Sequence, residues 1–211
     1  MKIGVLALQG AVTEHIVSIE KTGAEGVPIK RVEQLEEVEG LIIPGGESTT
    51  IGKLMRKYGF IEAIRDFSDQ GKPIFGTCAG MIVLAKKIAG GEPGHLELMD
   101  ITVARNAFGR QRESFECDLE VKGIDEPVRA VFIRAPLINE VGPGVDVLTV
   151  YNDEIVTARE GNLLVSSFHP ELTDDFRLHQ YFADMVEVNR EVQQQLSLIH
   201  ISEPTRHSLI S

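Results

Sequence analysis

The sequence is poor in cysteine: its 211 residues contain only Cys78 and Cys117. Two cysteines form no disulfide framework, so we expect a reducing, cytoplasmic setting. Basic residues are also in deficit, because 21 Lys and Arg stand against 32 Asp and Glu, for a formal net charge of -11. Nucleic-acid binding needs a basic stripe, and this acidic balance argues against nucleic acid as the main partner.

Long hydrophobic runs are missing as well. No apolar run approaches the roughly 20 residues that a membrane-spanning helix needs. The opening run MKIGVLALQG ends in a Gln-Gly pair and predicts a first buried strand, not a signal peptide. The C-x-x-C and H-E-x-x-H spacings of metal sites are absent, and so is the GKS or GKT of a Walker-type phosphate loop. Neither a metal centre nor a nucleotide site of that type is expected.

What the chain does have is a regular alternation of apolar and amphipathic segments in its first half. This alternation predicts βαβ units and a parallel sheet. Strands are expected at 2–7, 26–29, 40–43 and 73–77, and helices at 12–21, 50–70 (interrupted near Gly59) and 81–88.

The second half has a different texture. Strand-like runs follow one another closely, at 101–105, 115–121, 128–133, 145–151, 155–159 and 163–167. They predict an antiparallel or mixed extension of the same sheet, closed by an amphipathic helix over 174–193. The length suits one domain, expected over residues 1–192. The tail at 193–211 fits no period, and Pro204 would break a continuing helix, so we expect it to be disordered or foreign to the fold.

Cys78 lies in the stretch KPIFGTCAGMIVLAKKI, in the tight turn between a predicted strand and a predicted helix. Gly76 and Gly80 give the backbone room at this corner, as in a nucleophile elbow. At a helix N-terminus the dipole lowers a thiol pKa, and the Ala79 N–H would be free to donate to an oxyanion. The motif alone is equally compatible with a buried structural cysteine.

His169 differs from the other five histidines because it follows a predicted strand, in VSSFHPELTDD. Residues two apart in an extended segment point the same way, so Glu171 could orient the imidazole toward the thiol while Pro170 keeps the backbone extended. A turn with a stray acid is the alternative. Paired with the Cys78 turn, the catalytic interpretation gains weight, because each motif supplies what the other lacks.

The third motif, LIIPGGESTT at 41–50, ends a strand in Pro-Gly-Gly. Two glycines let a loop present backbone N–H groups to an anion, and Gly46 is the candidate second oxyanion donor beside Ala79. Ser48 or Thr49 could cap the next helix. A strand-helix turn that merely needs glycine is the plainer interpretation.

In combination these motifs resemble a known family. GTCAG, HPE and PGGES, in this order and spacing, are similar to the class I (triad) glutamine amidotransferases. The further segments IGVLALQGAVTEH, RNAFGRQRESFE and FIRAP resemble, more closely, the glutaminase subunits of pyridoxal 5′-phosphate synthase, the PdxT type. The resemblance covers about residues 1–192, and LQGAVTEH and RNAFGRQ are not general amidotransferase features.

The resemblance implies a role for each matching residue. It makes Cys78 the nucleophile, His169 the base and Glu171 the group that orients the base. An arginine fork suits the carboxylate of a free amino acid, although a surface ion pair is the simpler interpretation of each arginine. The implied L-glutamine site consists of Gly46, Glu47, Ser48, Arg105, Ile133 and Arg134. Gln9 is expected near the site and the partner interface, and Cys117 is expected to be a packing residue.

The expected architecture is an α/β, flavodoxin-like three-layer sandwich, whose central, mostly parallel sheet carries a mixed or antiparallel extension. The resemblance implies hydrolysis of L-glutamine to glutamate and ammonia without any cofactor. It also implies delivery of the ammonia to a synthase subunit (PdxS type) in a large hetero-oligomer. Two alternatives remain: the glutaminase of another pathway, such as imidazole glycerol phosphate synthase, and a regulatory subunit without catalysis.

Overall fold

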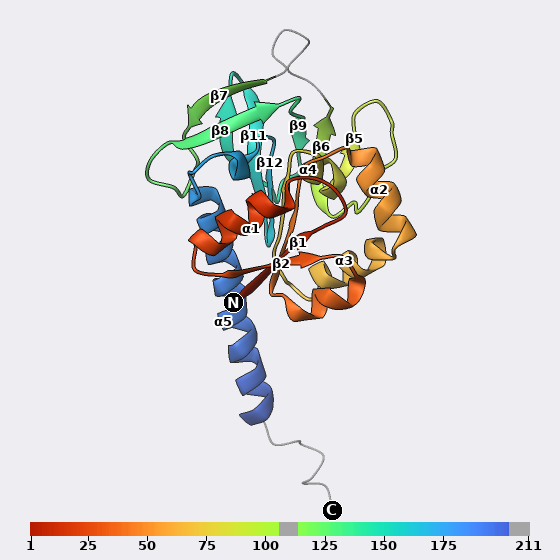
Figure 1. Ribbon diagram of the computed structural model, residues 1–211, viewed down its shortest axis with the longest axis vertical. Helices are drawn as coiled ribbons and strands as arrows, with labels where there is room; N and C mark the ends of the chain where they lie inside the picture. Colours follow the sequence, from red (N-terminus) through yellow and green to blue (C-terminus); the bar gives the residue numbers. More distant parts are fainter. Residues whose placement is uncertain (106–113, 203–211) are drawn as a thin grey trace, which may run out of the picture.

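The computed structural model describes residues 1–105 and 114–202. Within these residues the chain forms a curled central sheet with helices on both sides (Figure 1). In spatial order the path of the sheet is β2 (Glu25–Ile29), β1 (Lys2–Leu6), β3 (Gly40–Ile43), β4 (Ile74–Thr77), β12 (Leu163–Ser166), β11 (Glu154–Glu160), β9 (Leu137–Val141), β6 (Met99–Ala104) and β5 (Ala85–Ile88). Strand β10 (Asp146–Tyr151) pairs with β11, while β7 (Ser114–Leu119) and β8 (Val128–Ile133) form a separate hairpin.

Along the chain, the helices alternate with the strands in the first half, and the last helix follows the last strand. They are α1 (Val12–Lys21), α2 (Ser48–Lys57), α3 (Phe60–Asp69), α4 (Ala79–Leu84) and α5 (Arg177–Ser202), with 3-10 turns η1 (Val32–Glu37) and η2 (Pro170–Leu172). Strands β2, β1, β3, β4 and β12 are mutually parallel, whereas β11 runs antiparallel to β12, β9 and β10. The predicted parallel sheet with a mixed extension is therefore confirmed.

Side chains of the parallel strands alternate between the two faces of the sheet, as the two-residue period of a strand requires. In β3, Leu41 and Ile43 belong to one buried cluster and Ile42 to the other. The first cluster includes side chains of α2, α3 and α4, and the second includes side chains of α1 and α5. The sheet is thus the middle of three layers, and the expected sandwich is confirmed.

Some expected elements differ from the structure. The predicted helix over 81–88 is wrong in its second half: α4 ends at Leu84, and the chain continues as β5, which pairs in parallel with β6. The apolar run MIVLAKKI is compatible with a helix or with a strand. Its second half forms a strand because it pairs with β6, which lies further along the chain. Strand β9 was not expected at all.

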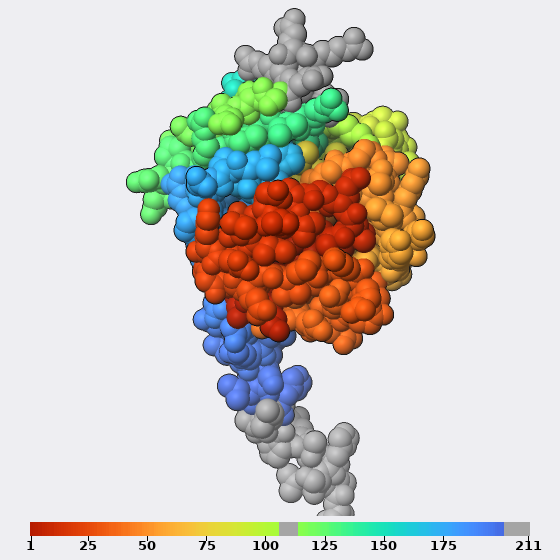
Figure 2. All heavy atoms as spheres, viewed as in Figure 1, coloured from red at the N-terminus to blue at the C-terminus, as the bar shows by residue number. Residues whose placement is uncertain are grey.

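Helix α5 is longer than expected. It runs through residue 193 to Ser202, and its C-terminal part projects from the body of the molecule (Figures 1 and 2). A domain boundary near residue 192 stays a prediction, and Pro204 and most of RNAFGRQ lie outside the described residues. Among the helices that the structure describes, none is long and apolar enough to cross a membrane.

The topology brings three loops to one edge of the sheet. Strands β3, β4 and β12 are adjacent and parallel, so their carboxyl ends lie side by side. The loop after β3 begins at Pro44, the turn after β4 contains Cys78, and the segment after β12 leads to His169. The carboxyl edge of a parallel sheet is the usual place for a site in α/β folds.

Candidate active site

Cys78 occupies the corner between β4 and α4 in a conformation that L-residues rarely adopt, with φ 52° and ψ -110°. Its N–H donates to the Ser166 carbonyl at 2.8 Å, which ties the corner to the end of β12. Such strain at a sharp strand-to-helix turn is typical of a nucleophile elbow. Ala79 is the first residue of α4, so its N–H precedes the intrahelical hydrogen bonds and is available to a ligand.

The glycines beside Cys78 are needed for close packing. A Cβ on Gly80 would lie 2.0 Å from the Ile43 carbonyl oxygen, and one on Gly76 would lie 2.5 Å from the Gly80 carbonyl oxygen. Helix α4 therefore contacts the backbone of β3 and β4 directly. This contact fixes the position of Cys78 relative to the loop after β3.

His169 and Glu171 are hydrogen-bonded: His169 Nδ1 lies 2.6 Å from Glu171 Oε1. The expected geometry is wrong, however, because Pro170 begins a 3-10 turn and does not extend the backbone. The turn folds Glu171 back beneath the imidazole, and the carboxylate side chain is fully buried. A hydrogen bond from the His169 N–H to the Val131 carbonyl, at 2.8 Å, anchors the turn to β8.

The His169 imidazole carries a strongly shifted pKa. Burial lowers it, but hydrogen bonds with Cys78 and Glu171 outweigh burial and raise the pKa of His169 to about 10. At neutral pH the ring is thus protonated on both nitrogens. Because Nδ1 is hydrogen-bonded to Glu171, Nε2 is the ring nitrogen that remains to interact with the Cys78 thiol.

Gly45 is a residue of this site that sequence reasoning missed. A Cβ at this position would lie 2.7 Å from His169 Cε1 and 3.4 Å from Cys78 Cβ. The backbone of the loop after β3 therefore packs directly against Cys78 and His169, with no side chain between them. The Pro-Gly-Gly motif was the available signal, but only its second glycine was singled out.

Gly46 has φ 145°, a conformation in which glycine is strongly favoured. A Cβ there would also meet Gln9 Oε1 at 2.6 Å. The same Gln9 oxygen accepts a hydrogen bond from the Glu47 N–H at 2.6 Å. Gln9 therefore contacts and orients this loop, whereas its expected place at the partner interface stays a prediction.

The cap of α2 is Glu47, so the expectation of Ser48 or Thr49 is wrong. The Glu47 carboxylate accepts hydrogen bonds from the N–H groups of Thr49 and Thr50, at 3.1 and 2.7 Å. Hydrogen bonds from the Thr50 hydroxyl and N–H lower the pKa of Glu47 to about 2. Ser48 is buried, and its hydroxyl has no hydrogen-bond partner within the described part of the chain.

Arg105 reaches the same loop from the end of β6. Its guanidinium pairs with Glu92 at 2.9 Å and Glu47 at 3.7 Å, and it donates to the Thr49 hydroxyl at 3.3 Å. The ion-pair interpretation of this arginine is confirmed, and its place in a glutamine site stays a prediction.

Ile133 and Arg134 approach the cysteine from the end of β8. The Ile133 carbonyl is 4.0 Å from Cys78 Sγ, and Arg134 has a left-handed backbone with φ 44°. Both residues are exposed. The other cysteine, Cys117, lies in β7 and pairs with Ala130 of β8, so it belongs to the hairpin and not to the Cys78 turn.

Two histidines near Glu171 also went unrecognised. His15 on α1 and His179 on α5 are buried, and their rings are hydrogen-bonded at 2.8 Å. The available signal for His15 was its place one turn before Ile19, on the buried face of α1.

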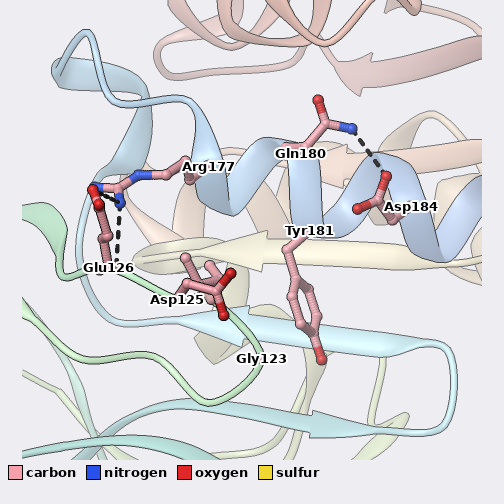
Figure 3. A pocket seen from close by; sticks show the side chains of 8 residues that line it. Gly123, Asp125, Glu126, Arg177, Gln180, Tyr181 and Asp184 are labelled. Carbon is pink, nitrogen blue, oxygen red and sulfur yellow. Dashed lines mark hydrogen bonds and ion pairs between the residues drawn. The ribbon is translucent and has the colours of Figure 1, made fainter.

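A separate surface pocket lies between the loop 123–126 and α5 (Figure 3). It is lined by Arg177, Tyr181 and several carboxylates, and it contains none of the residues at the carboxyl edge of the sheet. Without a nucleophile or an imidazole, it does not suit acyl chemistry. Among the described residues, no group of three His, Cys, Asp or Glu side chains could hold a metal ion.

Comparison with solved structures defines the class of protein. The chain resembles one described as a crystal structure of glutamine amidotransferase, with TM-score 0.84 and 50% identity, over 88% of this chain and 98% of that one. A chain of the PurLQS structure from Thermotoga maritima shares the fold alone, with TM-score 0.66 at 17% identity, over 87% of this chain and 97% of that chain.

The sequence narrows this class to a family. Residues 5–188 match the SNO glutamine amidotransferase family, and the chain belongs to it. Two relatives are named pyridoxal 5′-phosphate synthase subunit PdxT. The one from Niallia circulans is 75% identical over 88% of this chain and 98% of its own length. The one from Halalkalibacterium halodurans is 62% identical over 92% and 99%.

Proposed function

We propose that this chain is the glutaminase subunit of a pyridoxal 5′-phosphate synthase, and that it hydrolyses L-glutamine to glutamate and ammonia. The observation that carries the proposal is the convergence of Cys78 and the His169–Glu171 pair at one sheet edge, in a chain of the SNO family. The pathway, pyridoxal 5′-phosphate synthesis, is inferred from the names of two relatives of this chain.

The reaction begins when the Cys78 thiolate attacks the side-chain amide carbon of glutamine. The amide oxygen becomes an oxyanion, which the N–H groups of Ala79 and Gly46 stabilise. His169 Nε2–H then protonates the leaving nitrogen, the C–N bond breaks, and a thioester and ammonia result. Water, deprotonated by His169, attacks the thioester and releases glutamate and the thiolate. Glu171 holds the imidazole for both proton transfers.

Glutamine would be held by the loop after β3 and by the segments that face it. We assign Gly46, Glu47, Ser48, Arg105, Ile133 and Arg134 to this site. The unpartnered, buried Ser48 hydroxyl supports the assignment, because a buried polar group without a hydrogen bond is costly unless a ligand supplies one. Arg105 would bind the substrate carboxylate by exchanging its contacts with Glu47 and Glu92.

The partner would be the synthase subunit, of the PdxS type, in a large hetero-oligomer that receives the ammonia. No cofactor, nucleic acid or membrane takes part in this scheme. We place the reaction in the cytoplasm, because Cys78 and Cys117 are both free thiols. We assign residues 1–192 to the amidotransferase domain, which the family match over residues 5–188 supports.

Ammonia release from L-glutamine, measured with the synthase subunit present, tests this function. Cys78→Ala should abolish turnover, whereas Cys117→Ala, which removes the other thiol, should leave it near the wild-type rate. Equal activity in Cys78→Ala and wild type would show that Cys78 is not the nucleophile.

Labelling by a glutamine-analogue electrophile separates the remaining alternatives. Modification at Cys78 supports the glutaminase, and no modification with the synthase subunit bound would favour a non-catalytic subunit. Association with a cyclase-type partner, and not with the synthase subunit, would assign the chain to another pathway.

A further inference from the structure

The Glu171 carboxylate has a second side that the reaction scheme does not use. Oε1 binds His169, while Oε2 makes no hydrogen bond to any residue that the structure describes. His15 Nε2 lies 3.5 Å from Oε2, and both side chains are fully inaccessible to solvent. A buried carboxylate oxygen without a donor is costly, so the neighbouring imidazole matters.

His15 is held from two other elements. Its Nδ1 lies 2.8 Å from His179 Nε2 on α5, and its Nε2 lies 3.3 Å from the hydroxyl of Thr77, the residue before Cys78. The rings of the two histidines are 5.1 Å apart at 53°. A continuous line of polar groups therefore runs from α5 through α1 to Glu171 and His169.

Both histidines of this line are neutral. Burial lowers the pKa of His15 well below its usual value, and the neighbouring His179 and His169 lower it further. Burial alone lowers the pKa of His179 to about 3. The ionisable groups that face His15 are Glu171 from η2, His179 from α5 and, more distantly, the protonated His169.

Only one tautomer arrangement suits two neutral rings here. If His15 carried its proton on Nδ1, the Nε2 lone pair would face the Glu171 carboxylate, and His179 would be left with a buried, unpaired Nδ1–H. If His15 carries it on Nε2, that N–H faces both the Thr77 hydroxyl, at 3.3 Å, and Glu171 Oε2, at 3.5 Å, and His179 Nε2–H donates to His15 Nδ1. The atom left unpaired is then an acceptor, His179 Nδ1, and buried orphan acceptors are less unfavourable than orphan N–H donors.

We propose that His15 is a positioning residue for the glutaminase reaction, and that His179 fixes its tautomer. The His15 Nε2–H attracts the Glu171 carboxylate through Oε2, the oxygen that His169 does not use, so that Oε1 stays aligned with His169 Nδ1 during both proton transfers. The proposal rests on the proposed function. It extends the Cys78, His169 and Glu171 triad by two residues from helices far apart in the sequence.

Nuclear magnetic resonance can determine the tautomers in the wild-type chain without any turnover. Long-range ¹H–¹⁵N correlation on histidine-labelled protein distinguishes Nδ1–H from Nε2–H, and spectra of His15→Gln and His179→Gln assign the signals. We expect Nε2–H for both residues across neutral pH. An Nδ1–H tautomer or an imidazolium at His15 would overturn the proposal, even if every His15 variant failed to fold.

The pH dependence of Cys78 alkylation by iodoacetamide gives a second readout that needs no glutamine. His15→Met keeps the bulk but removes the donor, so the alkylation midpoint should rise by about one pH unit as the His169–Glu171 pair loosens. His15→Gln, whose amide N–H can replace Nε2–H, should restore a midpoint near wild type. Ser18→Ala, at another buried polar position on α1, is the matched control.

With the synthase subunit present, His15→Met should lower kcat roughly 10- to 100-fold, the effect of losing a hydrogen bond to a charged group. KM for glutamine should change less than about twofold, because His15 does not touch the substrate. A folded His15→Met with wild-type kcat and a wild-type alkylation profile would overturn the proposal. An inactive wild type would instead contradict the proposed function, while the tautomers and the alkylation profile would still test His15.

Discussion

Glu171 Oε1 lies 2.6 Å from His169 Nδ1 because the 3-10 turn that starts at Pro170 folds the carboxylate under the imidazole. The carboxylate is fully buried, so it acts on the ring without competition from water. The hydrogen bonds with Glu171 and Cys78 keep His169 protonated at neutral pH despite its burial.

Replacing Glu171 by Gln should therefore impair catalysis far more than substrate binding. We expect kcat to fall on the order of 10²–10⁴-fold, because the imidazole loses both its orientation and its anionic partner. KM for glutamine should stay within about threefold. Steady-state ammonia release with the synthase subunit measures both parameters. The control is Glu187→Gln, an acid on α5 whose single ion pair within residues 1–105 and 114–202 is with Arg190, at 3.7 Å. A kcat for Glu171→Gln close to the control would contradict this role.

A methyl group at Gly45 should damage the site more than the fold. In Gly45→Ala the Cβ would lie 2.7 Å from His169 Cε1, so the ring has to shift from its present position relative to Cys78. We expect at least about tenfold lower kcat, with a loss of unfolding free energy of about 1–3 kcal/mol. Gly144→Ala is the matched control, because its nearest contact would be an ordinary 3.5 Å to Glu160. Wild-type activity in Gly45→Ala would show that the loop and the imidazole are not in contact.

The raised pKa of His169 links stability to alkaline pH. Its ordinary value is 6.5 and its value in the folded chain is about 10, so the folded state binds the proton more tightly. The stabilisation is fully present below pH 6.5 and is lost as pH rises toward 10. It amounts to about a few kcal/mol. Urea unfolding of wild type and His169→Gln between pH 6 and 10.5 isolates it from other groups. The unfolding free energy of wild type, relative to that of His169→Gln, should decrease as pH rises across this window. A difference that does not change with pH would contradict the raised pKa of His169.

The Asp175 carboxylate should stabilise the folded chain, and this stabilisation should be lost at acid pH. Its carboxylate accepts hydrogen bonds from the N–H groups of Arg129 and Arg177, at 3.0 and 3.1 Å, and from the Arg177 side chain at 2.6 Å. These interactions, the Arg177 side chain first, lower its pKa from 3.8 to about 2. The contribution is present above pH 3.8 and is lost as pH falls through 2.

Asp175→Asn should lower the unfolding free energy at neutral pH by about 1–3 kcal/mol, because it weakens hydrogen bonds to a charged group. Denaturant unfolding measures this loss. The neighbouring Asp174→Asn is the control, since the Asp174 side chain is fully exposed and should change stability by less than about 0.5 kcal/mol. Equal effects of the two substitutions would show that the Asp175 contacts do not stabilise the chain.

The early strands and helices follow from local pattern. The helix predicted at 12–21 and the strand predicted at 40–43 coincide with α1 and β3, because strong amphipathic or apolar periodicity with clear end signals leaves little choice. The position at which α4 ends cannot be predicted from the local sequence pattern. Residues 85–88 become β5 because β6, 14 residues further on, offers a parallel partner.

Capping and turns show the same limit. Glu47, and not Ser48, caps α2, because the loop from Pro44 points the Glu47 side chain at the free N–H groups while it buries Ser48. Pro170 was expected to extend the chain, yet it begins η2, since proline is equally compatible with the first turn of a helix.

By itself the sequence determined the layer architecture and the residues capable of acyl chemistry, because period, glycine placement and the types of side chain are local properties. Only the tertiary structure decided what surrounds them. Gly45 contacts His169, and His15 meets His179 across 164 residues, because parallel strands and packed helices join distant segments. No local pattern encodes such contacts; they exist only once burial of the two apolar faces has closed the sheet between its helices.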